Sequence, residues 1–175
     1  MAIIEAIETV YLEADTASVT FSSLGSYEHL QIRVSGRDNH AGSGGNSIYI
    51  RFNGDTGSNY STETIQGYNG ANTGADRYAS QAYVYAGGRI TGPLTPAAEN
   101  YGASIIDILD YANANKNTSI QQASGVTLDY SSNSYNWFSG SVWDNTAALT
   151  SILLYPPSGS FLRGTTISLY GIKSS

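Results

Sequence analysis

Charged residues are scarce in this 175-residue sequence. They make up 13% of the chain, about half of the roughly 25% that is usual for soluble proteins. Lysine is nearly absent, with only Lys116 and Lys173. The polar surface must therefore consist mostly of neutral Ser, Thr, Asn, Gly and Tyr. Such a surface suits broad hydrogen-bonded contacts with protein or carbohydrate.

Cysteine, basic clusters and long apolar runs are also missing. The absence of cysteine excludes disulfides and thiol chemistry. The net charge of −6 disfavours nucleic acid and anionic membranes as partners. The longest apolar runs, such as SILLY at 151–155, are too short to span a bilayer. The first fifteen residues lack the features of a secretory signal, so we expect a soluble protein that starts at its own methionine.

Apolar and polar residues alternate along most of the chain, which is the pattern of half-buried β-strands. Gly-, Pro-, Asn- and Ser-rich turns separate the strands. We predict an all-β fold, an antiparallel β-sandwich of jelly-roll type with about 8–10 strands. Residues 1–15 form a short N-terminal arm or first strand, in which AIIEAIE is compatible with one helical turn, and residues 16–175 form a single domain. The predicted strands are 18–24, 29–37, 47–53, 62–68, 77–86, 103–112, 118–124, 136–144, 149–155 and 165–172.

Residues for catalysis are few. The two histidines, His29 and His40, are isolated in the sequence and are expected to be exposed polar residues. Asp107 and Asp110 are the closest pair of strand carboxylates, but a spacing of three on a strand points them to opposite faces. A shared catalytic cleft of the glycosidase type is therefore not expected. We predict no catalytic residues, no metal ligands and no cofactor.

The loop NGDTGSN at 53–59 is the strongest candidate for an ion or sugar site. It offers the carboxylate of Asp55 and side-chain oxygens from Asn53 and Asn59. Calcium sites normally use several carboxylates, and the glycines of this loop also fit tight turns. The favoured interpretation is a turn that ends a strand, and an ion or sugar site is the alternative.

Aromatic residues are the other candidates for a sugar site, because a saccharide binds on aromatic platforms beside polar side chains. Trp137 and Trp143 are six residues apart and so point to the same face of a strand. Aromatic residues on strands more often pack in the core or across strands. The candidates are Tyr60, Tyr68, Tyr78, Tyr83, Tyr85, Tyr135, Trp137 and Trp143.

The C-terminal segment NTAALTSILLYPPSGSFLRGTTISLYGIK resembles the end of a jelly-roll domain that is widespread in tailed bacteriophages. Earlier stretches resemble it in the same order: VTFSSL, YEHLQIRVSGR, IRFNGDTGSNYS and ASIIDILDYANANKN. The resemblance covers residues 17–173. It implies a virion protein with a β jelly-roll sandwich, found in capsid decoration (cement) proteins and in tail or fibre proteins, commonly as trimers.

The resemblance and the absence of an evident active site together predict a non-enzymatic capsid decoration protein. It would bind and stabilise the shell of major capsid protein on the outer surface of the virion, as a homotrimer. The alternative is a tail- or fibre-associated module that binds a host receptor or glycan; a carbohydrate-active enzyme or its binding module is a third possibility. We expect Ile3, Ile4 and Ile7 of the N-terminal arm to contact a neighbouring subunit or the capsid.

Overall fold

The computed structural model describes residues 3–40, 45–70, 72–91, 100–127 and 134–173. Within these ranges the chain forms twelve β-strands and no helix. The strands form two sheets in which all neighbouring strands are antiparallel. The all-β antiparallel sandwich predicted from the sequence is therefore confirmed. The jelly-roll connectivity is a finer statement and stays a prediction.

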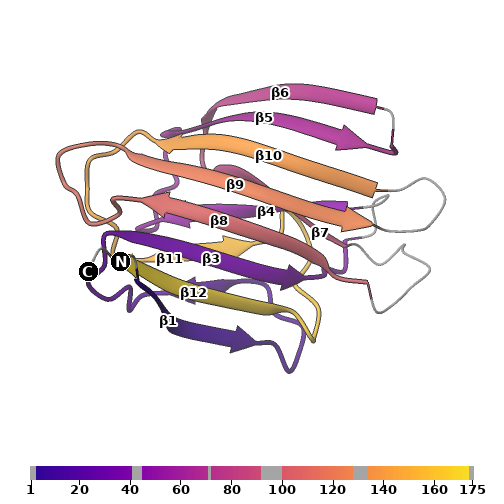
Figure 1. Cartoon of the computed structure of the whole chain (residues 1–175), viewed down its shortest axis with the longest axis horizontal. Coiled ribbons are helices and arrows are strands. Elements are labelled where there is room, and N and C mark those ends of the chain that lie inside the picture. Colours follow the sequence, from indigo (N-terminus) through magenta and orange to yellow (C-terminus); the bar gives the residue numbers. More distant parts are fainter. Residues whose placement is uncertain (1–2, 41–44, 71, 92–99, 128–133, 174–175) are drawn as a thin grey trace.

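The larger sheet has eight strands and forms the front layer in Figure 1. Its edge strands are β1 and β6. In spatial order its strands are β1 (Ile3–Tyr11), β12 (Thr166–Lys173), β3 (His29–Gly36), β8 (Gly102–Leu109), β9 (Thr118–Thr127), β10 (Ser134–Trp143), β5 (Tyr60–Tyr68) and β6 (Asn72–Gln81).

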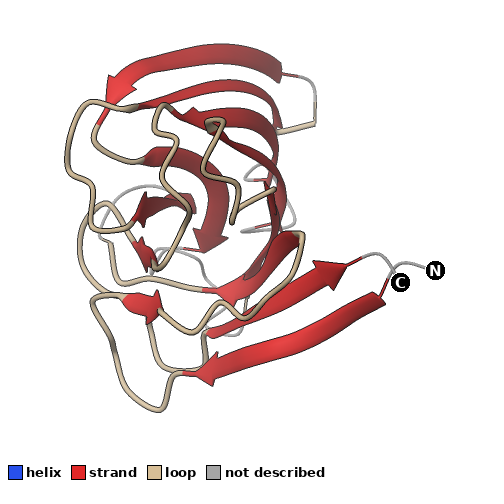
Figure 2. Ribbon diagram, turned by 90° about the vertical axis from the view of Figure 1, so that its left-hand side faces the viewer, coloured by secondary structure: helices blue, strands red, loops and turns tan. Residues whose placement is uncertain are grey.

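The smaller sheet has four strands and packs against one face of the large sheet. Figure 2 shows the large sheet curling over the small sheet, while the two strands that carry the N- and C-termini project away from it. No helix in the described ranges is long and apolar enough to cross a membrane. In spatial order the strands of the small sheet are β2 (Val19–Phe21), β11 (Ile152–Tyr155), β4 (Gly45–Phe52) and β7 (Val84–Thr91).

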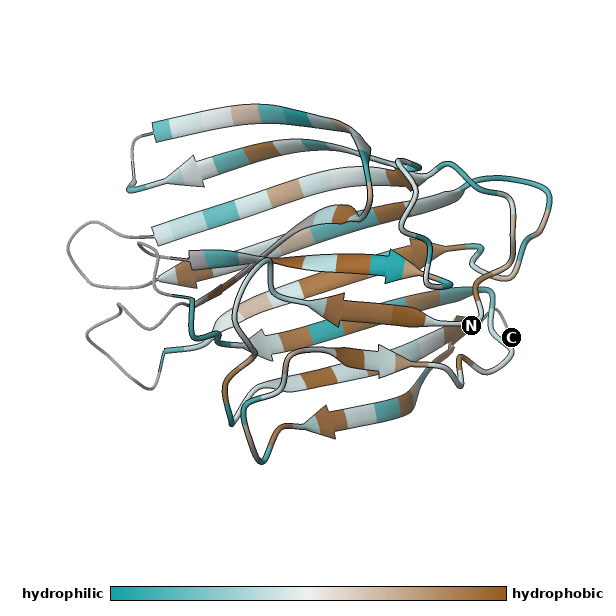
Figure 3. Ribbon diagram, turned by 180° about the vertical axis from the view of Figure 1, so that it is seen from behind, coloured by the Kyte–Doolittle hydropathy of each residue, from teal (hydrophilic) through white to brown (hydrophobic). Residues whose placement is uncertain are grey.

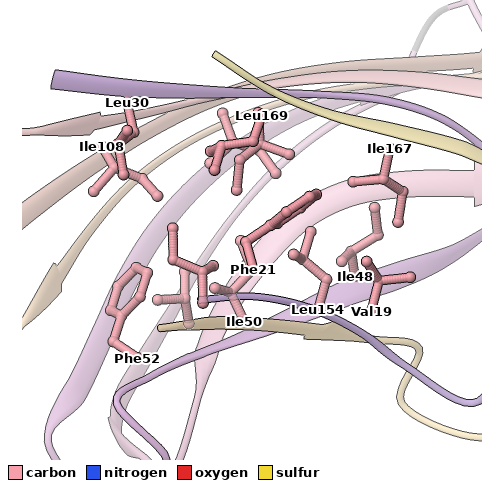
Figure 4. Close-up of a cluster of buried hydrophobic side chains, with 14 of the residues drawn as sticks. Val19, Phe21, Leu30, Ile48, Ile50, Phe52, Ile108, Leu154, Ile167 and Leu169 are labelled. Carbon is pink, nitrogen blue, oxygen red and sulfur yellow. The ribbon is translucent and has the colours of Figure 1, made fainter. Parts of the chain in front are cut away.

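The core lies between the two sheets and is built from every second residue of the strands. On β3 the buried residues are Leu30, Ile32 and Val34, and on β4 the fully buried residues include Ile48 and Phe52. Figure 3 shows this alternation as bands of hydrophobic and hydrophilic colour along the strands. Figure 4 shows the side chains of both sheets meeting in one cluster, among them Phe21, Leu154, Ile167 and Leu169.

The structure corrects the predicted elements in the N-terminal arm and in the stretch 77–86. The stretch AIIEAIE forms no helical turn: from Ile3 it belongs to β1, whose backbone pairs with β12; residues 1–2 of the predicted arm lie outside the described residues. The predicted strand 77–86 is two strands that belong to different sheets. Ser80 adopts a positive φ of 55°, which few non-glycine residues do, and the chain then passes from β6 to β7.

Candidate functional site

The loop at residues 53–59 is held together by its own side chains. Asn53 and Gly54 adopt positive φ values of 52° and 69°, which turn the chain after β4. The Asn53 side-chain oxygen accepts hydrogen bonds from the backbone N–H groups of Thr150 (2.7 Å) and Ser151 (3.1 Å). This asparagine therefore joins the turn to the segment that leads into β11.

The carboxylate of Asp55 also holds the loop in place. It accepts hydrogen bonds from the Gly57 backbone N–H (2.8 Å), the Asn59 side-chain amide (2.9 Å) and the indole Nε1 of Trp143 (2.7 Å). These bonds, with that of Asn59 foremost, lower the pKa of Asp55 below its ordinary value. Of the two interpretations of this loop, the contacts favour the turn.

The described residues contain no group of three or more His, Asp or Glu side chains that could hold a metal ion. Asp107 lies on β8 and accepts a hydrogen bond from the Gln31 side chain (2.8 Å). Asp110 lies in the turn beyond β8, with a positive φ of 50°, so the expectation that both carboxylates lie on one strand is wrong. Asp110 contacts Lys116 and, at 3.4 Å, His29, and the bond from Lys116 lowers its pKa.

Near His40 lies a buried carboxylate that sequence reasoning missed. The His40 ring Nδ1 is 2.6 Å from the Ser158 hydroxyl. The Asp38 carboxylate accepts a hydrogen bond from the His40 backbone N–H (3.3 Å) and another from the Asn46 side chain. Asp38 therefore contacts the His40 backbone, and no Asp–His–Ser relay is assembled. Burial raises the pKa of Asp38 to about 6.

The aromatic candidates and the rings that contact them divide into a buried and a half-buried group. Trp137, Trp143 and Tyr60 are buried in the core, so the expectation that both tryptophans share a face is confirmed, and that face is the inner one. In the half-buried group, Tyr49 and Tyr83 stack with ring centroids 3.8 Å apart. Tyr85 of the same group stacks at 4.0 Å on Tyr78 of β6 in the large sheet.

We call this half-buried group the tyrosine cluster. The ring centroids of Tyr155 and Tyr85 lie 5.7 and 5.6 Å from that of Tyr49, and the Arg51 guanidinium lies 5.0 Å from the centre of the Tyr155 ring. Partial burial raises the pKa of both Tyr49 and Tyr155. The members of the cluster are Tyr49, Tyr83, Tyr85 and Tyr155.

A second surface feature is the outer face of the large sheet, the face that points away from the small sheet. The alternation of the strands and the pairing registers place all six large hydrophobic side chains recorded as exposed on this face. Of the described strands, none packs on it (Figures 1 and 2). These side chains belong to Ile4, Tyr11, Ile65, Ile105, Leu109 and Phe138.

Three of these side chains lie in one line across the sheet. The register pairs Ile105 with Ala123, Ala123 with Phe138, Phe138 with Ile65, and Ile65 with Ala75. These five residues, which we call the apolar row, cross five neighbouring strands from β8 to β6. Ile105, Phe138 and Ile65 are 46%, 44% and 61% exposed.

A hollow of about 840 Å³ lies beside the apolar row. The next outward positions along the same strands are small or polar: Gly125, Asn136, Gly67 and Thr73 form the neighbouring cross-strand line. Because the two glycines carry no side chain, the surface is lower there than along the apolar row. The hollow is lined by Ile65, Gln66, Gly67, Thr73, Gly74, Ala75, Ala123, Ser124, Asn136, Trp137 and Phe138.

The three isoleucines predicted to form an interface have different environments. Ile4 is 53% exposed on the outer face. Ile3 is half-buried, and Ile7 is half-buried and packs against the core. A β-bulge lies between Ala6 and Glu8, which explains why the side chains before and after it change sides. Ile4 is therefore the member of the trio that is most available to a neighbour.

Comparison of the sequence with models of known protein families and with curated proteins found no match. The fold and the two surfaces thus stand on the structure alone.

Proposed function

We propose that this protein is a non-enzymatic structural component of a tailed-bacteriophage virion. In this role it is a capsid decoration protein, which binds the outer surface of the assembled major capsid protein shell and stabilises it. The ordered resemblance over residues 17–173 supports the phage assignment. The all-β sandwich is the fold class that this resemblance implies.

The structural observation that carries the proposal is the uncovered outer face of the large sheet. Isolated exposed hydrophobic residues are normal on proteins, but contiguous apolar patches mark interaction sites. The apolar row is continuous over five strands, and Ile65 within it is 61% exposed. A face of this kind is suited to contact with protein.

The carboxylates considered as candidates for binding or catalysis also favour a structural role for the protein. Asp55, Asp107 and Asp110 each contact partners within the fold. A decoration protein needs no reaction, because it acts by mass action. Binding to the assembled shell, and not to free capsid subunits, shifts the equilibrium towards the assembled state.

The test is the position and copy number of the protein in purified particles. We expect hundreds of copies per virion on the capsid, and a lower temperature of shell disruption in particles that lack the protein. Adding the purified protein back should restore the heat stability. A handful of copies located on the tail would overturn the assignment.

We propose further that Ile4 on β1 contacts a neighbouring subunit or the capsid. Ile4→Ser should weaken attachment to particles at least tenfold while the urea unfolding midpoint stays close to that of the wild type, because the side chain is largely exposed. Ile7→Ser is the matched comparison. Ile7→Ser should lower the urea unfolding midpoint, because the Ile7 side chain packs against the core.

The tyrosine cluster favours a second candidate, a tail- or fibre-associated module that binds a host glycan. Tyrosine rings beside an arginine provide stacking and hydrogen-bonding groups for a sugar. A glycan array with the purified protein tests this candidate, with Tyr83→Ala as the cluster variant. Tyr11→Ala, which alters an exposed tyrosine on the other sheet, is the control. Binding that Tyr83→Ala abolishes and Tyr11→Ala keeps would favour this candidate.

A further inference from the structure

We propose that Asn69, in the turn between β5 and β6, is a site of spontaneous chemical modification. Its side-chain amide is lost as ammonia, and the residue becomes an aspartate or an isoaspartate. This chemistry belongs to the turn itself. It goes beyond the proposed role in the virion and does not depend on that role.

The reaction requires an asparagine whose following peptide nitrogen is accessible, and glycine, which has no side chain, leaves it most accessible. The Gly70 nitrogen attacks Cγ of Asn69. A bond forms between this nitrogen and Cγ, the bond between Cγ and Nδ2 breaks, and Nδ2 leaves as ammonia with the proton of the Gly70 nitrogen. Water then opens the resulting succinimide ring at one of its carbonyls, which gives aspartate or isoaspartate. Water is the only co-reactant, and nothing is oxidised or reduced.

Two Asn-Gly pairs occur in the sequence, at 53–54 and 69–70, and their backbones are alike. The φ values are 52° and 69° in the first pair and 54° and 76° in the second. A Cβ added at Gly54 or Gly70 would meet nothing within 4 Å. The backbone conformation and the space around the glycine therefore do not distinguish the two pairs. A difference in reactivity must come from the asparagine side chains.

The side-chain amide of Asn53 is held at both ends. Its oxygen accepts hydrogen bonds from the backbone N–H groups of Thr150 (2.7 Å) and Ser151 (3.1 Å), and its Nδ2 donates to the carbonyl of Ala148 (2.9 Å). Asn53 is also half-buried. Rotation of the side chain towards the Gly54 nitrogen would break these bonds and leave their partners unsatisfied. The fold therefore protects Asn53 from the reaction.

The side-chain amide of Asn69 is held by a single weak contact. Asn69 is exposed, and its oxygen accepts a hydrogen bond from the backbone N–H of Ser134 at 3.3 Å, which is longer than most such bonds. Within the described part of the chain, no hydrogen bond from Nδ2 of Asn69 is recorded. Exposed side chains change rotamer rapidly. The Asn69 side chain is therefore able to reach the geometry of attack.

The modification changes the turn as well as its charge. The backbone N–H of Asn69 donates a hydrogen bond to the carbonyl of Ser134 (3.0 Å), so this residue joins the turn to the start of β10. An isoaspartate carries one additional methylene in the backbone, which displaces the groups that make these bonds. Either product also adds one negative charge to a chain whose net charge is −6.

Peptide mapping by mass spectrometry tests the proposal. The folded, full-length protein is incubated at mildly alkaline pH, and the conversion of each asparagine is followed with time. We expect Asn69 to convert at least tenfold faster than Asn53. In urea the two should convert at similar rates, because both precede glycine and neither side chain is held. A preference for Asn69 that is confined to the folded protein therefore comes from the structure.

Labelling with a protein isoaspartyl methyltransferase measures the isoaspartyl product independently. Asn69→Gln should reduce the label at least fivefold, because a glutamine has to close a larger ring, which forms more slowly. Asn72→Gln, at the exposed start of β6, is the matched control and should keep the label. Far-UV circular dichroism checks that both variants are folded.

The proposal is overturned if Asn69 does not convert in the folded protein, or converts no faster than Asn53. A label that persists in Asn69→Gln would overturn it as well. These outcomes are separate from the fate of the virion assignment, which fails through the position and copy number of the protein in particles.

Discussion

At the scale of single residues, the side chains that looked most suited to binding hold the fold together. Asp55 joins its own loop to Trp143 at the end of β10. Asn53 joins the same loop to the approach of β11. The turn after β4 is thus connected to both sheets. The polar residues of this loop were visible in the sequence, but their partners lie about ninety positions away in the chain.

Asp55→Asn should lower the free energy of unfolding by about 2 kcal/mol, because an amide keeps only one of the two acceptor oxygens and the buried indole N–H loses its partner. Urea unfolding followed by tryptophan fluorescence measures this loss. Glu8→Gln, at an exposed position on β1, is the control and should change stability by less than about 0.5 kcal/mol. Equal effects of the two substitutions would contradict the structural role of Asp55.

Asp38 should make stability depend on pH in the sense opposite to most carboxylates. Its pKa is raised from 3.8 to about 6 because the side chain is buried. The stabilisation associated with this raised pKa is complete below pH 3.8 and is lost as pH rises through about 6. Two pKa units correspond to about 3 kcal/mol.

The measurement is the difference in unfolding free energy between Asp38→Asn and the wild type. We expect this difference to move in favour of the variant by about 2 kcal/mol between pH 4 and pH 7. Taking the difference cancels the opposite contribution of groups such as Asp55 and Asp110, whose pKa values are lowered. Parallel pH curves for the two proteins would show that the carboxyl is not titrating in this range.

At the scale of elements, the edge strand β1 is fixed to the sandwich by more than its pairing with β12. The Tyr27 hydroxyl donates a hydrogen bond to Glu5 of β1 (3.0 Å), and Glu5 lies 3.2 Å from Lys173 of β12. The Tyr27 ring lies so close to Gly171 that an added Cβ would come within 2.2 Å of it. Only glycine at this position of β12 permits the approach.

Gly171→Ala should therefore destabilise the protein by about 1–3 kcal/mol, the usual cost of overpacking. Gly140→Ala on β10 is the matched control, because a Cβ there meets nothing within 4 Å. That substitution should be neutral or slightly stabilising. Thermal unfolding of the two variants measures the difference in stability. Similar losses of stability for both would rule out the contact with Tyr27 as the cause.

At the scale of the whole molecule, the two sheets share one core. The strand β2 has only three residues, yet its Phe21 is fully buried between the sheets (Figure 4). Trp137 and Trp143 both lie on β10 of the large sheet. Because the core is continuous, removing a buried side chain from the small sheet should also lower the stability of the large sheet.

Phe21→Ala should lower the unfolding free energy by about 3–5 kcal/mol through the cavity it creates. The unfolding midpoint observed by tryptophan fluorescence should shift together with that observed by circular dichroism. A fluorescence transition that stays at the wild-type midpoint would mean that the small sheet unfolds separately, against the single core described here.

The sequence by itself determined the fold class, because period-two alternation and turn residues are local properties of the chain. In SIIDIL, however, Ile105, Ile106, Ile108 and Leu109 are all apolar. The tertiary structure buried Ile106 and Ile108 and left Ile105 and Leu109 on the outer face, because the small sheet covers only one side of the large one. The apolar row and the partners of Asp55 arise the same way, from pairings between strands far apart in the chain.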